Sequence, residues 1–325
     1  MPLRWPTIAA ALALAALASA LVMGGALEVG EDPGERATAP ARAPTPRVEV
    51  TPGPAEPPPG DDPLAPAFAP LPPLPLPAFD PAAAPRWIAA ASGPVPELNQ
   101  VSLEQDLALA AEVLGPGGRV LFGAGPGTLT VQELAAPREL DPLTAALGEL
   151  FAPRSDRGLR YRETRLTTAE PATADAVVAA LDHALAGGPE PLLLYLGGHG
   201  NLGDLPRHNT VSLWAQSELS VVDLAARLDE SPRPVRLVVT TCFSGGFADV
   251  VFRGADEALG ASVGERCGLF SAPWDLEATG CDPNPDRATH DGYGLHVLEA
   301  LRGRDREGKP LPPATLDLDG DGRIS

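Results

Sequence analysis

Short apolar runs alternate with segments of helical periodicity from residue 98 onward. The apolar runs contain few charged residues and are rich in Leu and Val, which is typical of strands buried on both faces of a sheet. They lie at 119–123, 191–198, 235–241 and 267–272. The segments with apolar residues at helical spacing lie at 102–114, 174–186, 221–228 and 294–303. This alternation predicts an α/β domain with a mostly parallel sheet and helices on both faces.

Local signals place the starts of three of these helices. Ser102 with Gln105 and Ser220 with Asp223 have the spacing of a capping box, and Thr173 is a suitable N-cap. The segment 211–220, between a helix and the strand before it, predicts a small hairpin or loop.

The first 27 residues predict export. Positions 8–27 carry only apolar residues, Gly and Ser, which is enough to span a bilayer, and the segment 18–20 resembles a signal-peptidase site. Arg4 precedes the run and acidic residues follow it, so the rest of the chain is expected to cross the membrane. The segment is either a cleaved signal peptide or a retained anchor, and the protein is expected to be secreted or membrane-anchored outside the cytoplasm.

A proline-rich segment follows the N-terminal run. Twenty of the 39 prolines lie between Pro33 and Pro96, and this stretch lacks the apolar periodicity that a core needs. It predicts a disordered, extended linker. The expected organisation is therefore a signal peptide or anchor at 1–27, a linker at 28–97 and one folded domain at 98–325.

The formal net charge of −19 argues against a nucleic-acid partner. Binding to a phosphate backbone requires a basic face, and no cluster of Lys and Arg is visible in the sequence.

Two of the predicted strands end in residues that can carry out chemistry. The strand at 191–198 leads into His199 and Gly200, and the strand at 235–241 leads into Cys242. One helix separates the two strands, so a right-handed crossover makes them parallel and opens their carboxyl ends on the same side of the sheet. A thiolate there can attack a peptide carbonyl, and an imidazole can protonate the leaving amine. The backbone N–H groups of Gly200 and Cys242 are candidate oxyanion donors.

The pattern of strand, His-Gly, strand and Thr-Cys-Phe-Ser-Gly-Gly resembles the legumain-like cysteine peptidases, which have a caspase-like fold. The stretch 267–281 is similar to the strand and acidic loop that follow the nucleophile in that family. The resemblance covers 98–325 and implies a three-layer sandwich that hydrolyses peptide bonds through an acyl-enzyme. It implies Cys242 as the nucleophile, His199 as the general acid, a peptide or protein as the substrate, and no required cofactor.

The sequence also departs from the family. Legumains have an acidic residue two positions before the nucleophile, where this chain has Thr240, and their first strand is followed by an Asn that orients the histidine. We assigned that loop to 123–127, which contains no Asn. The resemblance therefore does not carry asparagine specificity over to this chain. Thr240, Asp275 and Glu277 are the candidate residues of a substrate pocket.

The favoured function is that of an active endopeptidase, and two alternatives stay open. In the first, the chain is a catalytically inactive relative that serves as an interaction module of the cell envelope. In the second, the His199 and Cys242 dyad is active but transfers the acyl group to an amine instead of water, which makes the protein a transpeptidase.

Two further motifs concern cysteines and calcium. Cys267 and Cys281 either form a disulfide or remain free, which leaves Cys242 as a reactive thiol in both cases. Near the end of the sequence, Asp317, Asp319 and Asp321 occupy positions 1, 3 and 5 of a calcium-loop pattern. The acidic residue of position 12 would fall beyond residue 325, so the motif is either an incomplete loop or part of a longer chain.

Overall fold

The computed structural model describes residues 72–77, 80, 82–135, 158–288 and 290–312. These residues belong to one compact unit, Phe68–Ser325. The expected signal peptide or anchor, most of the expected linker and the three calcium-loop aspartates lie outside the described residues. Within the described ranges, no helix is long and apolar enough to cross a bilayer.

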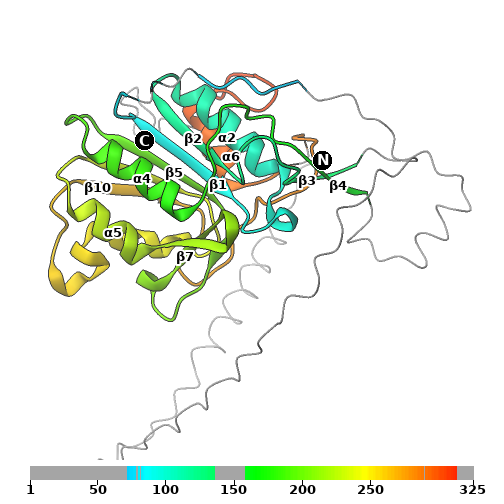
Figure 1. The fold of residues 1–325 in the computed structure, drawn as a ribbon. Coiled ribbons are helices and arrows are strands. Elements are labelled where there is room, and N and C mark those ends of the chain that lie inside the picture. The colour runs from blue at the N-terminus through cyan, green and yellow to red at the C-terminus, as the bar shows by residue number, and fades with distance from the viewer. Residues whose placement is uncertain (1–71, 78–79, 81, 136–157, 289, 313–325) are drawn as a thin grey trace, which may run out of the picture. The chain divides into compact units, whose positions relative to one another are not determined.

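A five-stranded, all-parallel sheet forms the centre of the domain (Figure 1). Its strands are β1 (Trp87–Ser92), β2 (Gly118–Phe122), β5 (Leu192–Gly198), β9 (Val235–Val239) and β10 (Arg266–Phe270). Their spatial order is β10-β9-β5-β1-β2. The four strands predicted from the apolar runs are thereby confirmed, and the parallel sheet with them.

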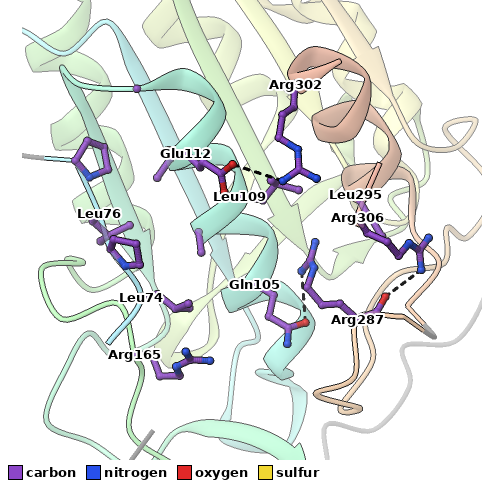
Figure 2. A pocket seen from close by; sticks show the side chains of 15 residues that line it. Leu74, Leu76, Gln105, Leu109, Glu112, Arg165, Arg287, Leu295, Arg302 and Arg306 are labelled. Atoms are coloured by element: carbon purple, nitrogen blue, oxygen red, sulfur yellow. Dashed lines mark hydrogen bonds and ion pairs between the residues drawn. The ribbon is translucent and has the colours of Figure 1, made fainter. Parts of the chain in front are cut away.

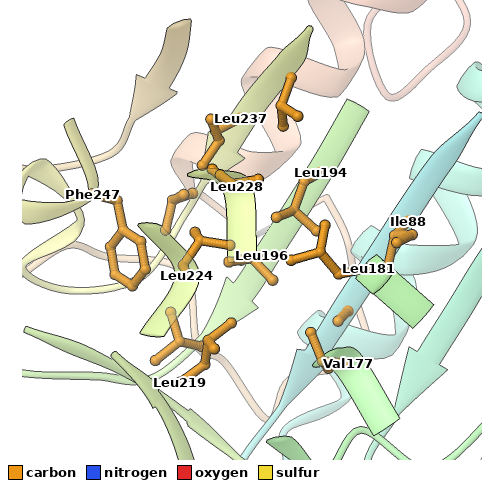
Figure 3. Close-up of a cluster of buried hydrophobic side chains, with 14 of the residues drawn as sticks. Ile88, Val177, Leu181, Leu194, Leu196, Leu219, Leu224, Leu228, Leu237 and Phe247 are labelled. Carbon is orange, nitrogen blue, oxygen red and sulfur yellow. The ribbon is translucent and has the colours of Figure 1, made fainter. Parts of the chain in front are cut away.

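Helices cover both faces of this sheet. They are α2 (Val101–Leu114), α4 (Ala174–Leu185), α5 (Val221–Asp229) and α6 (Tyr293–Arg302). Side chains of β1 alternate between two buried clusters: Ile88 packs with α4 and α5, whereas Trp87 and Ala89 pack with α2 and α6. Figure 3 shows the first cluster, in which Leu181 of α4 and Leu224 of α5 lie against the sheet. The predicted three-layer arrangement of helix, sheet and helix is present.

Strand β1 corrects the predicted domain boundary at residue 98. It lies between β5 and β2, inside the segment that we predicted to be linker, and all six of its residues are buried. Its sequence, WIAAAS, contains four residues of weak strand preference among prolines, which hid the strand. Further upstream, Leu74 and Leu76 pack against the cluster that contains α2, and the Leu74 N–H donates to the Arg165 carbonyl at 2.9 Å.

Two small antiparallel sheets flank the central one. The first pairs β3 (Val131–Leu134) with β4 (Leu159–Arg162). The second contains β6 (Gly200–Asn201), β7 (Thr210–Leu213) and β8 (Ser217–Ser220), which confirms the hairpin predicted at 211–220. Short 3₁₀ helices include η1 (Pro96–Leu98), η5 (Ser244–Val251) and η7 (Glu257–Leu259).

The helix starts were predicted with mixed success. The side chains of Thr173 and Ser220 accept hydrogen bonds from the N–H groups of Ala176 and Asp223, as expected of N-caps. The capping box predicted at Ser102 is wrong, because α2 begins one residue earlier. The Ser102 hydroxyl instead accepts a hydrogen bond from the Asp282 N–H at 2.8 Å and so ties a distant loop to the helix.

Candidate active site

The structure brings His199 and Cys242 to neighbouring strand ends. Strand β5 ends just before His199, strand β9 ends three residues before Cys242, and the two strands pair in parallel with Leu196 opposite Val239. Beyond the strands the two segments remain in contact: a Cβ built on Gly200 would lie 2.2 Å from the Cys242 carbonyl oxygen. Only glycine fits at this position, and its absence of a side chain lets the histidine segment lie against the cysteine segment.

The His199 ring is held by the loop that follows β1. Its Nε2 lies 2.9 Å from the Leu98 carbonyl oxygen and 3.1 Å from Gln100 Oε1. A carbonyl can only accept, so this network assigns the proton to Nε2 and leaves the Nδ1 lone pair for chemistry. Burial lowers the pKa of His199, and the hydrogen bond to Leu98 opposes that shift only in part.

This contact corrects the assignment of the histidine-orienting loop to 123–127. That segment follows β2, whereas the loop that reaches the imidazole follows β1, which the sequence analysis missed. Asn99 stabilises this loop: its Oδ1 accepts from the Gly93 N–H and its Nδ2 donates to the Thr130 carbonyl, both at 3.1 Å. The signal that was available in the sequence is the Leu-Asn-Gln segment between an apolar run and a helix.

Cys242 lies at the start of a tight turn. Its half-buried Sγ accepts from the Ala278 N–H at 3.3 Å and donates to the Ala278 carbonyl at 3.5 Å. The next residue, Phe243, has a left-handed backbone with φ of 59°, and its N–H donates to the Leu276 carbonyl at 2.8 Å. No hydrogen bond joins Cys242 to His199 in the described structure, as is common for catalytic pairs without substrate.

Both expected oxyanion donors are available. The His199 carbonyl accepts from the Ser212 N–H, so the Gly200–Val211 pair is of the non-hydrogen-bonded type and the Gly200 N–H points away from β7. Among the described residues, the Cys242 N–H likewise has no hydrogen-bond acceptor. Two such donors on touching segments are suited to stabilising a developing oxyanion.

Asn209 joins the histidine loop to the cysteine loop. Its Nδ2 donates to the carbonyls of Phe243 and Trp274 at 2.9 and 2.7 Å, and its Oδ1 accepts from the Gly203 N–H at 2.9 Å. The side chain is buried, so these bonds are shielded from water. Sequence reasoning missed this residue, because Asn in a polar loop gives no signal of long-range contacts.

The predicted pocket residues lie in different environments. Thr240 is half-buried, and its Oγ1 lies 3.5 Å from the hydroxyl of buried Tyr195. Asp275 and Glu277 are both exposed, in and just after a turn that follows β10. The structure thus places Thr240 in the sheet layer and the two carboxylates at the surface.

A buried polar cluster lies behind Thr240. A Cβ on Gly294 would lie 2.6 Å from the Tyr195 hydroxyl and 3.2 Å from Asp106 Oδ2. Asp106 accepts from Arg287 at 3.0 Å and lies 3.9 Å from His290 Nε2. Burial raises the pKa of Asp106, against the opposing charges of Arg287 and His290, and burial lowers the pKa of His290. This cluster fastens the 280–290 loop to α2.

All three cysteines are free thiols. The disulfide considered between Cys267 and Cys281 is therefore not formed. Cys267 is exposed on edge strand β10. Desolvation, and then the negative charge on nearby Cys242, raise the pKa of Cys281 to about 12.

A hollow away from the dyad and the arrangement of possible metal ligands also bear on ligand binding. A hollow of about 590 Å³ lies between the 74–77 segment, α2 and α6, with Arg287, Arg302 and Arg306 on one side (Figure 2). Neither His199 nor Cys242 lines it. Across the described residues, no group of three or more His, Cys, Asp or Glu side chains is arranged to hold a metal ion.

Comparison of the sequence with protein-family models and with curated proteins found no match.

Proposed function

We propose that this protein is a cysteine-type endopeptidase with a caspase-like domain of the legumain type. The observation that supports this most strongly is the direct contact between the Gly200 and Cys242 segments at adjacent parallel strand ends. At this edge of the sheet lie the Cys242 thiol, the His199 imidazole with an available Nδ1, and the N–H groups of Gly200 and Cys242.

In the proposed reaction, the Cys242 sulfur attacks the carbonyl carbon of a peptide bond and its proton passes to His199 Nδ1. Negative charge develops on the carbonyl oxygen, where the N–H groups of Gly200 and Cys242 stabilise it. His199 then protonates the leaving amine, which departs and leaves a thioester. Water, deprotonated by the same imidazole, hydrolyses the thioester and restores the thiol.

The contacts of His199 bear on the alternative of an inactive relative. That reading drew its support from the missing histidine-orienting Asn. Leu98 and Gln100 supply hydrogen bonds to the ring in its place, which favours the active enzyme. The proposed substrate is a peptide or protein, with no cofactor required, and the proposed location is outside the cytoplasm, either secreted or tethered through residues 8–27.

Labelling with a thiol-reactive peptide probe tests this proposal. We expect the wild type to react at Cys242 and Cys242→Ala to lose both labelling and peptide hydrolysis. Cys267→Ala is the matched control, because it removes a more exposed thiol on the neighbouring strand and should change neither. Equal labelling of the two variants would contradict the assignment, since it would show that Cys242 is no more reactive than Cys267.

A further inference from the structure

Bulky apolar side chains are exposed on the loops that hold the dyad. They are Leu98, Leu202, Leu205, Trp274 and Leu276, and we call this set the apolar rim. The backbone of each loop touches the site: the Leu98 carbonyl accepts from His199, and the Leu276 carbonyl accepts from Phe243, next to the nucleophile. Leu276 is 55% exposed and Leu202 is 53% exposed.

The rim is held in place rather than left to collapse. Asn209 fixes the Gly203 and Trp274 backbones, and a Cβ on Gly246 would lie 2.4 Å from the Pro206 carbonyl oxygen. Since the loops are tied through their backbones, their leucines and tryptophan cannot easily turn inward to bury themselves. Bulky apolar side chains that stay exposed on several loops meeting at a reactive site indicate a surface that a ligand covers.

Acidic side chains alternate with the apolar rim. Glu97 precedes Leu98, Asp204 precedes Leu205, and Asp275 and Glu277 flank Leu276; all four are exposed. The cations on these loops are already engaged, since Arg207 lies 3.4 Å from Asp256 and His208 pairs with Asp204. Among the described residues, Glu97, Asp275 and Glu277 have no cationic partner. The loops that meet at the dyad therefore carry exposed apolar side chains and an excess of negative charge.

We infer that the substrate segment recognised at this site is a cationic amphipathic stretch of polypeptide, in which bulky apolar residues contact the rim and Lys or Arg residues face the carboxylates of Glu97, Asp275 and Glu277. Cleavage of that segment rests on the proposed function, whereas its binding does not. Apolar contacts would supply most of the affinity, and the carboxylates would select positive over negative partners.

Binding to the Cys242→Ala protein tests the ligand class without turnover. Four fluorescent decapeptides combine Leu or Ser with Lys or Glu, and fluorescence anisotropy gives their Kd values. The Leu/Lys peptide should bind at least about tenfold more tightly than each of the other three, on the scale of one or two buried side chains. Raising the salt concentration should weaken this binding, because exposed charges are screened.

Variants locate the binding surface. Trp274→Ser and Leu276→Ser should each weaken binding of the Leu/Lys peptide about fivefold to tenfold. Leu259→Ser is the matched control, since Leu259 is 57% exposed on η7 and outside these loops. The Asp275→Asn/Glu277→Gln double variant should reduce the salt dependence, whereas Glu230→Gln on the exposed end of α5 should leave it unchanged.

The outcomes separate the two proposals. The inferred substrate class is wrong if the Ser/Glu peptide binds as tightly as the Leu/Lys peptide. It is also wrong if Leu259→Ser weakens binding of the Leu/Lys peptide as much as Trp274→Ser does. Cleavage of peptides regardless of their class would overturn this inference and leave the endopeptidase intact. Selective binding of Leu/Lys by a wild type that cleaves none of the four would support the ligand class and count against the endopeptidase.

Discussion

At the scale of single residues, the account depends most on Gly200. A Cβ on it would lie 2.2 Å from the Cys242 carbonyl oxygen, and its N–H points away from β7, which leaves it available as an oxyanion donor. A methyl group there would push the histidine segment from the cysteine segment and misplace one oxyanion donor. We expect Gly200→Ala to lower kcat by about 10²- to 10³-fold, the loss typical of one such donor.

A second glycine provides the control for this substitution. A Cβ on Gly188 would meet only the flexible carboxylate of Glu190, so Gly188→Ala should retain full kcat. Steady-state kinetics on both variants, with thermal melting to verify folding, makes the comparison. Near-normal kcat in a folded Gly200→Ala protein would refute the role given to this contact.

We expect protonation of His199 to set the acid limb of the pH dependence of kcat/KM. Burial lowers the pKa of its imidazole below the usual 6.5. Protonation in acid removes the base that accepts the thiol proton, so activity falls as the pH drops through this lowered pKa. The acid limb of kcat/KM, which reports the free enzyme, should therefore have its midpoint below 6.5.

The His290→Asn variant tests whether the acid limb comes from His199 or from protonation of another histidine. Among the described residues, His290 is the other histidine whose pKa is lowered by burial. If His199 sets the limb, His290→Asn should leave the midpoint in place. A wild-type midpoint above 6.5, or a shift in the His290→Asn variant, would be inconsistent with the assignment.

At the scale of elements, a buried ion network holds the β3–β4 hairpin to α2. Arg162 pairs with Glu104 and with Glu133, each at 2.7 Å, and Thr164 also donates to Glu104. Both carboxylates are almost fully buried. Burying them is costly unless a cation compensates, so the network is sensitive to loss of its arginine.

Arg162→Met should lower the free energy of unfolding by about 3–5 kcal/mol, because it leaves buried Glu104 without a cation, whereas Glu133 keeps its pair with Arg160. Arg227→Met is the control: Arg227 is exposed and lies 3.9 and 4.0 Å from Asp182 and Glu230, so its loss should cost less than about 1 kcal/mol. Urea denaturation measures both. Equal losses would mean that the network contributes no more than surface pairs.

The elements that the sequence predicted share a strong local signal. α4 and α5 have caps and regular apolar spacing, and β5 and β9 are short, mainly apolar runs. β1 was missed because its alanines become a strand only through burial between β5 and β2. The pair of β3 and β4 was missed too, because it depends on ion pairs between residues far apart in the sequence, which hydrophobic periodicity cannot reveal.

The candidate site shows the same division. His199 and Cys242 were identified because each follows a recognisable strand, and β-α-β handedness brings such ends together. Leu98 and Gln100 were not, since their loop follows the unrecognised strand. Asn209 and Ala278 act through backbone contacts across 34 and 36 positions, and no local pattern encodes such contacts.

At the scale of the whole molecule, β1 extends the folded domain to the N-terminal side of residue 98. A chain that starts at residue 72 retains β1 and the leucines that pack on α2, so it should fold and keep its probe reactivity. A chain that starts at residue 98 lacks an internal strand of the sheet and should be unfolded or aggregated. Circular dichroism and gel filtration compare the two. A folded, reactive chain from residue 98 would restore the boundary predicted from the sequence.

The central claim is that Cys242 becomes acylated during turnover, and trapping that intermediate tests it most directly. The protein is mixed with an activated peptide ester, quenched in acid within the first turnover and analysed by intact-mass and fragment-mass spectrometry. We predict a mass increase equal to the acyl group, located on Cys242 and absent from Cys242→Ala. Ester hydrolysis without an adduct on Cys242, or an adduct on Cys267 or Cys281, would contradict the account.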